Sequence, residues 1–346
     1  MVLVSPILLL NYLVLLISLM MMGTCQSSFG CYLSFELNLI GSIFLLYWGP
    51  RGSINCGVYI YYQVMGSIFF GASCVFLNSS FFWGGNWVEW IIWVGLCVGF
   101  IVKIGCFPFH HWVWVVLTSS SWVNIFIFGV FQKCGQFLMV GNMGFEEYPM
   151  IFLFFSFITT SFVGSLMGLD KQTVSEFMVC SILFQTGVMG MLSLVSLADF
   201  KIYFFFYFFM SVNFFFSLHL ASKSRYFSPY KNMVSEPFLG KMVVFGFYGI
   251  CLMGFPPTKG FFLKSFLVLS LLKAGNVFMS TLMMILSVVS AFWYYQMMKK
   301  WMVILKNDLK GFKKLEFVKL KSNLSSWGGM FCYFGMICFD LIMSGK

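Results

Sequence analysis

Residues 103–112 read Lys-Ile-Gly-Cys-Phe-Pro-Phe-His-His-Trp and lie inside an apolar stretch that extends from 88 to 118. At about 1.5 Å per residue, this stretch is longer than one helix needs to cross a bilayer about 30 Å thick. Pro108 removes a hydrogen-bond donor and clashes with the preceding turn, so we expect the helix to break there. The freed backbone groups are tolerated in a membrane only where protein or water satisfies them. The sequence therefore predicts a broken membrane helix with a lysine, Lys103, beside the break.

A second apolar stretch, 241–273, has the same design. It contains Gly-Phe-Pro-Pro-Thr-Lys-Gly at 254–260, followed by Lys264. Paired broken helices in the two halves of a transporter mark an ion path between inverted repeats. An ordinary proline kink in a packed bundle is the alternative at each position. A lysine beside each interruption favours the ion path, because ionisable residues inside membranes are usually functional.

The composition is that of an integral membrane protein. The 346 residues are 60% hydrophobic and 9% charged, whereas a soluble domain is about 25% charged. We therefore expect an all-α integral membrane protein in which residues 1–346 form a single polytopic membrane domain. Hydropathy places about eleven transmembrane helices, at 2–22, 29–48, 56–77, 88–118, 122–140, 149–169, 173–197, 200–221, 241–273, 277–298 and 326–343.

Lysines and arginines in the loops account for most of the net charge of +10. They gather on the N-terminal side of the predicted membrane, at 51, 171, 223–231 and 299–321. By the positive-inside rule we expect the N-terminus on the matrix or cytoplasmic side, and an odd number of spans places the C-terminus opposite. We expect these basic loops to interact with membrane lipid, including anionic lipid, and we expect no nucleic-acid partner. Residues 299–325 are either a basic matrix-side loop or a helix along the membrane surface.

Charged residues deep in the apolar stretches are the candidate site residues: Glu36, Lys103, Lys133 and Lys264. A charge near the centre of a membrane helix costs about 2.5–3.5 kcal/mol by insertion scales. A low-dielectric environment favours a neutral lysine, whereas a nearby carboxylate favours the charged form. A lysine–glutamate pair can therefore act as a proton switch, and a row of lysines can pass a proton along. A static ion pair that holds helices together is the alternative.

Histidine adds one further candidate. His110 follows Pro108 at the predicted break, and histidine is the residue type suited to proton transfer near neutral pH, so we weigh His110 as a proton relay. The chain has no phosphate-binding glycine loop, no haem-attachment motif and no iron–sulfur cysteine spacing. We therefore expect no cofactor and no metal on this chain, and energy for transport from a gradient or a partner.

The motifs around these residues are similar to those of a known family. Residues 103–113 resemble the pattern Lys-x-Gly-x-x-Pro-Phe-His-x-Trp-Val, and 254–264 resemble Gly-Leu-Pro-Pro-x-x-Gly-Phe-x-x-Lys. Phe-Gln-Lys at 131–133 is similar to Trp-Gln-Lys, and Phe-Glu-Leu-Asn at 35–38 to Leu-Glu-x-Asn. These patterns belong to chain 2 of mitochondrial NADH–ubiquinone oxidoreductase, an antiporter-like membrane subunit of respiratory complex I.

The resemblance implies an antiporter-like inverted-repeat bundle that translocates protons through Glu36, Lys103, Lys133 and Lys264. Quinone reduction would take place on other subunits, which would carry NADH, FMN, iron–sulfur clusters and ubiquinone. The partners would be other complex I membrane subunits. The chain would lie in the mitochondrial inner membrane, with its N-terminus on the matrix side and its C-terminus on the intermembrane-space side.

The seventh predicted span departs from the family pattern. The family opens this span with Arg-Lys, where this chain has Ser-Glu at 175–176, and continues to His-x-Gly, where this chain has Gln-Thr-Gly at 185–187. A stand-alone cation/proton antiporter shares broken helices and buried lysines, so it remains the alternative function. A membrane scaffold without conduction is a third possibility, and it predicts that neutralising the buried lysines has no effect.

Overall fold

The computed structural model describes residues 6–25, 27–49, 52–79, 86–145, 147–169, 171, 173–221, 248–249, 251–252, 254 and 258–311. In these ranges the regular secondary structure is helical, and six helical stretches are long and apolar enough to cross a membrane. The main helices are α1 (Pro6–Thr24), α2 (Ser28–Tyr47), α3 (Gly52–Ser79), α4 (Asn86–Ile104), α5 (His111–Thr118), α6 (Trp122–Phe126), the π-helix η2 (Ile127–Phe131), α7 (Gln132–Asn142), α8 (Glu147–Met167), α9 (Val174–Val195), α10 (Leu197–Ala221), α12 (Lys259–Lys273) and α13 (Val277–Gly311).

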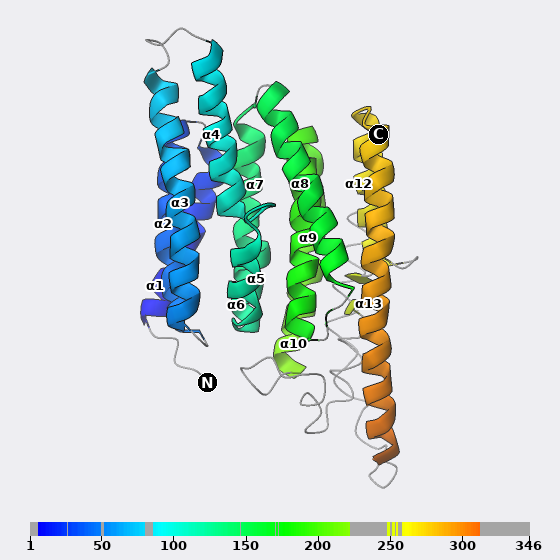
Figure 1. Ribbon diagram of the computed structural model, residues 1–346. Coiled ribbons are helices and arrows are strands. Elements are labelled where there is room, and N and C mark those ends of the chain that lie inside the picture. The colour runs from blue at the N-terminus through cyan, green and yellow to red at the C-terminus, as the bar shows by residue number, and fades with distance from the viewer. Residues whose placement is uncertain are drawn as a thin grey trace.

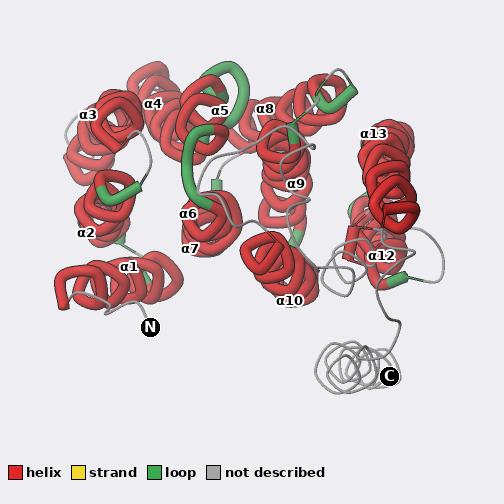
Figure 2. Tube along the Cα trace, turned by 90° about the horizontal axis from the view of Figure 1, so that it is seen from below, coloured by secondary structure: helices red, strands yellow, loops and turns green. Residues whose placement is uncertain are grey.

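The helices stand side by side with their long axes roughly parallel (Figure 1). Helices adjacent in sequence pack as neighbours, most extensively α1 with α2, α3 with α4, and α8 with α9. Seen along the helices, α1 to α3 form one end of the bundle and α12 and α13 the other (Figure 2). Between these ends lies α7, which packs against α1, α4, α9 and α10. The central helix of the bundle is therefore the one that carries Lys133.

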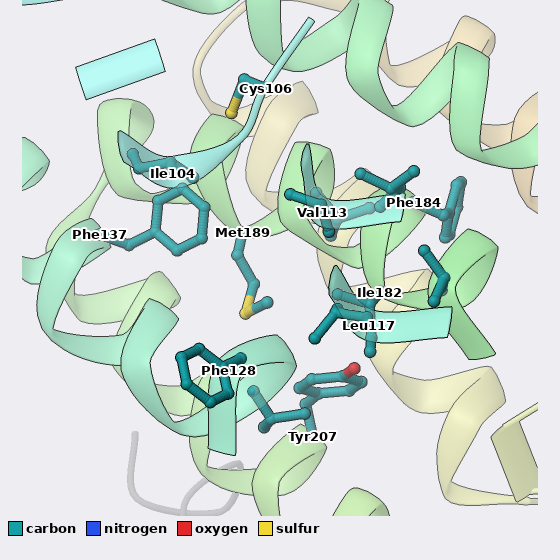
Figure 3. Close-up of a cluster of buried hydrophobic side chains, with 14 of the residues drawn as sticks. Ile104, Cys106, Val113, Leu117, Phe128, Phe137, Ile182, Phe184, Met189 and Tyr207 are labelled. Atoms are coloured by element: carbon teal, nitrogen blue, oxygen red, sulfur yellow. The ribbon is translucent and has the colours of Figure 1, made fainter. Parts of the chain in front are cut away.

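Aromatic and sulfur-containing side chains fill the centre of the bundle. In Figure 3, Met189 of α9 lies between Phe137 of α7 and Phe128 of η2, and Tyr207 of α10 lies beside Phe128. In a membrane, lipid is as apolar as these side chains, so close packing rather than transfer from water holds the helices together. Methionine fills irregular gaps and makes favourable contacts with aromatic rings. This packing fixes α7, α9 and α10 against one another.

The helix break expected near Pro108 begins at a glycine cap. Gly105 has a φ of +78°, and the amides of Gly105 and Cys106 both donate to the carbonyl of Ile101 at 3.0 and 2.9 Å. This arrangement is a Schellman-type helix ending, in which glycine adopts the left-handed conformation without a side-chain penalty. The indole nitrogen of Trp112, from α5, donates to the carbonyl of Val102 at 3.1 Å. Protein groups thus satisfy the backbone where α4 ends and before α5 begins at His111.

The second predicted break and the C-terminal region are described only in part. Gly254 has a φ of +76°, and α12 begins at Lys259, while 255–257 lie outside the described residues. Helix α13 continues from the predicted span through Lys299 to Gly311, so the first part of the 299–325 segment is helical. The rest of that segment and the predicted span 326–343 also lie outside the described residues.

Candidate functional site

Glu36 and Lys103 form an ion pair between α2 and α4. The amine of Lys103 lies 3.3 Å from a carboxylate oxygen of Glu36, and the two side chains are 1% and 31% exposed. The same amine lies 4.5 Å from the centre of the Phe35 ring, an additional favourable contact for a cation. The pair is therefore asymmetric: the lysine is enclosed, whereas the carboxylate reaches the surface of the bundle.

Helix α3 shapes the position of Lys103. A Cβ at Gly66 would come within 2.7 Å of the Lys103 side chain, so the absence of a side chain at Gly66 makes room for the lysine stem. The side-chain amide of Gln63 donates to the backbone carbonyl of Lys103 at 3.1 Å. This carbonyl lies in the last turn of α4, where the helix has no further amides to offer. Lys103 is thus held at a helix C-terminus, which favours a positive charge.

Lys133 is the most isolated of the buried lysines. It is 2% exposed, and its amine has no hydrogen-bond partner among the described residues. The thiol of Cys106, at the break after α4, lies near this amine. A buried polar group without a partner is expensive, so its presence calls for an explanation.

The π-helix η2 directly precedes Lys133 and was not predicted from the sequence. It covers Ile127–Phe131, and Gln132 and Lys133 begin the helix that follows it. Single-turn π segments are rare and frequent at functional sites. Helix α9 approaches closely here, because a Cβ at Gly129 would meet the side chain of Ile182. Lys133 is therefore the second residue after a π turn that packs against α9.

The side chain of Lys264, a residue of α12, contacts α13. Its amine donates to the carbonyl of Ser287 at 3.0 Å and to the hydroxyl of Ser290 at 3.5 Å. A Cβ at Gly254 would lie 2.9 Å from the lysine side chain, which places Lys264 against the second interruption. In contrast to Lys133, this lysine is in contact with polar groups of a neighbouring helix.

His110 immediately precedes α5, and its ring stacks on Phe107 with a centroid distance of 5.9 Å. Of the predicted site residues, the structure brings Glu36 and Lys103 into direct contact, and it places Lys133 and Lys264 on other helices. Helices α4, α7 and α12, which carry the lysines, follow one another across the bundle in Figure 1. The lysines therefore lie in a row that runs across the helix axes, with α9 and α10 between the helices of Lys133 and Lys264.

Known proteins are similar to this chain in sequence and in architecture. A family model described as NADH:quinone oxidoreductase/Mrp antiporter, transmembrane, matches residues 7–290. NADH-ubiquinone oxidoreductase chain 2 of Locusta migratoria is 24% identical over 350 residues, which cover 95% of this chain and 97% of the relative.

Solved structures show the same fold. A chain of respiratory complex I from Thermus thermophilus has a TM-score of 0.71 at 20% identity and covers 83% of this chain and 69% of its own length. A chain of the Mrp complex from Dietzia sp. has a TM-score of 0.67 at 14% identity, with 78% and 55% covered. The all-helical, antiporter-like membrane fold predicted from the sequence is confirmed.

Proposed function

The chain belongs to the NADH:quinone oxidoreductase/Mrp antiporter family, and from this premise we propose that it is a proton-translocating membrane subunit of a mitochondrial NADH:ubiquinone oxidoreductase. Its similarity to chain 2 of that enzyme in Locusta migratoria, along almost the full length of both chains, supports this assignment. Electron transfer from NADH through FMN and iron–sulfur clusters to ubiquinone would take place on other subunits. This chain would bind neighbouring membrane subunits and would carry no cofactor itself.

The observation that carries the proposal is the isolated amine of Lys133 in the central helix of the bundle. An unpartnered polar group in a packed apolar site lowers stability, typically by about 1–3 kcal/mol. A methionine would fill much of the same space without this penalty. The lysine is therefore best explained by a task that an apolar residue cannot perform, and accepting and releasing a proton is the characteristic chemistry of an amine.

The Glu36–Lys103 pair supplies a switch for that transfer. While the carboxylate is 3.3 Å away, it favours the charged form of Lys103. When the carboxylate moves away or is neutralised, the buried ammonium loses its partner and releases its proton. Neutral Lys133 then accepts this proton and passes it to Lys264. The exposed side of Glu36 lets a neighbouring subunit or water influence the switch.

The proposed topology has eleven spans, two of them broken, with the N-terminus in the matrix and the C-terminus in the intermembrane space. The interruption between α4 and α5 and the left-handed Gly254 before α12 support the two breaks. Lysines in the 299–325 segment would lie on the matrix side, near anionic lipid headgroups. Protons would move from the matrix to the intermembrane space.

Two experiments test the proposal in order. Gently solubilised source membranes are separated by native electrophoresis, stained for NADH dehydrogenase activity, and searched for this chain by mass spectrometry. We expect the chain in the active high-mass band. In the assembled enzyme, Lys133→Met should then lower the number of protons pumped per NADH oxidised, whereas Lys201→Met, at an exposed position on α10, should not. Unchanged pumping in the Lys133 variant would overturn the relay.

A stand-alone cation/proton antiporter is the second candidate, because the fold is shared with a chain of the Mrp complex from Dietzia sp.. An antiporter would be driven by an existing ion gradient rather than by NADH oxidation. It would migrate alone or as a small oligomer in the native gel. A scaffold role predicts normal pumping after neutralisation of Lys133, so the second experiment distinguishes it.

A further inference from the structure

Buried polar side chains from α9, α10 and α13 meet between the helices that carry Lys133 and Lys264. The hydroxyl of Tyr203 donates to the side-chain oxygen of Gln185 at 2.6 Å. The hydroxyls of Ser181 and Tyr294 form a second hydrogen bond. Tyr203 and Tyr294 are 2% and 4% exposed, so these groups are enclosed in the bundle. Ser181 and Gln185 are four residues apart on α9 and share one helix face, which places the two hydrogen bonds in one cluster.

One end of this cluster reaches Lys264. On α13, Ser287, Ser290 and Tyr294 are spaced by three and four residues and therefore share one helix face. The amine of Lys264 donates to the first two of these residues. Tyr294, on the next turn, is bonded to Ser181 of α9. Polar groups thus follow one another from Lys264 along α13 and across to α9, and one helical turn separates Tyr294 from Ser290, whose hydroxyl donates to the carbonyl of Ser287 at 2.8 Å.

The other end of the cluster faces the central helix. Tyr203 and Tyr207 stack on α10 with a centroid distance of 6.5 Å, and Tyr207 lies beside Phe128 of η2 (Figure 3). Both α9 and α10 pack against η2 and α7. Lys133 follows η2 directly, so the packing of Tyr207 links the cluster to the helix of Lys133, while no described group is hydrogen-bonded to the Lys133 amine itself.

We propose that a hydroxyl array carries protons between Lys133 and Lys264; Gln185 positions it, and its members are Ser181, Tyr203, Ser290 and Tyr294. The proposal rests on the proton-translocating function proposed above. Proton transfer is assigned to these residues because Gln185 stands where the related family has a histidine. A histidine can relay a proton by itself, whereas here several groups share the transfer.

The chemistry of the array is a series of concerted proton shifts. Serine and tyrosine hydroxyls each donate one hydrogen bond and accept others. Each hydroxyl releases its own proton toward the next hydroxyl or a bridging water and takes one from the preceding donor, so one proton crosses the array, no hydroxyl stays charged, and the amide of Gln185 carries no proton. Water molecules complete steps that are longer than a hydrogen bond. Gln185 is a positioning residue, because its oxygen fixes the hydroxyl direction of Tyr203.

The test removes single hydroxyls from the assembled enzyme and measures protons pumped per NADH oxidised. Tyr294→Phe keeps the ring and should reduce this ratio to the level of Lys264→Met. Tyr295→Phe is the matched control, because its side chain is 57% exposed and lies outside the array, and it should leave the ratio unchanged. If Lys264→Met lowers the ratio and Tyr294→Phe does not, the array is refuted. If Lys264→Met has no effect either, the proposed function itself fails.

Substitutions of Gln185 separate a transfer role from a merely structural one. Gln185→Leu removes the acceptor of Tyr203 and should lower the ratio of protons to NADH. Gln185→His supplies an imidazole that accepts this hydrogen bond and should restore the ratio. Native electrophoresis verifies assembly of each variant, and Tyr203→Phe replaces Tyr294→Phe if the latter does not assemble. Equal ratios for Gln185→Leu and the unsubstituted enzyme would remove Gln185 from the proposal.

Discussion

Replacing Lys133 with methionine is expected to stabilise the bundle while it stops proton transfer. The buried amine lacks a hydrogen-bond partner in the described part of the chain, a defect that typically costs about 1–3 kcal/mol. Methionine is unbranched and apolar but one heavy atom shorter, and a missing methylene-sized group costs about 1 kcal/mol. The net gain in stability should therefore be about 0–2 kcal/mol, which corresponds to at most about 30-fold in an opening equilibrium.

Alkylation of a buried thiol measures this gain in the purified enzyme. Cys180 of α9 is 0% exposed and is a free thiol, so a reagent reaches it only after local opening. Helix α9 packs against α7, so a more stable α7 should slow labelling of Cys180 by about the same factor. The exposed Lys273→Met substitution is the control and should leave the rate unchanged. Faster labelling of the Lys133 variant would mean that the lysine contributes net stability, and the argument from its isolation would be wrong.

Two further predictions concern the first half of the chain. Glu36→Gln leaves the buried ammonium of Lys103 without its partner at 3.3 Å and should destabilise the bundle by about 2 kcal/mol, less than a fully buried pair because the carboxylate is 31% exposed. Adding Lys103→Met to Glu36→Gln should recover most of this loss of stability in the same alkylation assay. Glu89→Gln, at an exposed position, is the control and should have little effect. Equal effects of the two glutamate variants would argue against the ion pair. Gly105→Ala places a side chain at a φ of +78° against crowded neighbours, whereas Gly144→Ala, at a φ of +57°, meets open space. Both variants should lose about 1–2 kcal/mol of folding stability from backbone strain. Only the Gly105 variant should also reduce the amount of assembled enzyme on native gels. Similar amounts of assembled enzyme for the two variants would show that the helix break tolerates a side chain.

The sequence predicts the helical framework well where hydropathy changes sharply. The predicted spans 29–48, 122–140 and 277–298 correspond to helical stretches that differ from them by a few residues at most ends. The exception is the end of α13, which continues to Gly311 beyond the last apolar turn. Hydropathy detects where an apolar stretch ends, but it does not show whether the helix continues through the polar residues that follow.

Within the site, the sequence identifies the charged residues but not their partners. Glu36 and Lys103 are separated by 67 positions, and only the packing of α2, α3 and α4 brings them together. Gly66 and Gln63, which shape the position of Lys103, look like ordinary residues of a membrane helix. The π turn of η2 is equally hard to predict, because its sequence Ile-Phe-Gly-Val-Phe contains no proline, and a glycine such as Gly129 is common in membrane helices.

The hydroxyl array shows that the sequence alone can suggest a function for some polar residues of a membrane helix but not for others. A lysine in an apolar span is expensive, so its position by itself suggests a function. A serine or threonine is cheap, because its hydroxyl can bond to a carbonyl of its own helix, as Ser156 and Thr160 do at 2.7 Å. Ser181 differs from these residues only because Tyr294, 113 positions away, lies opposite it. Tertiary contact therefore separates a hydroxyl that takes part in a chain of polar groups from one that only caps its own backbone, and substitution of Tyr294 tests that distinction directly.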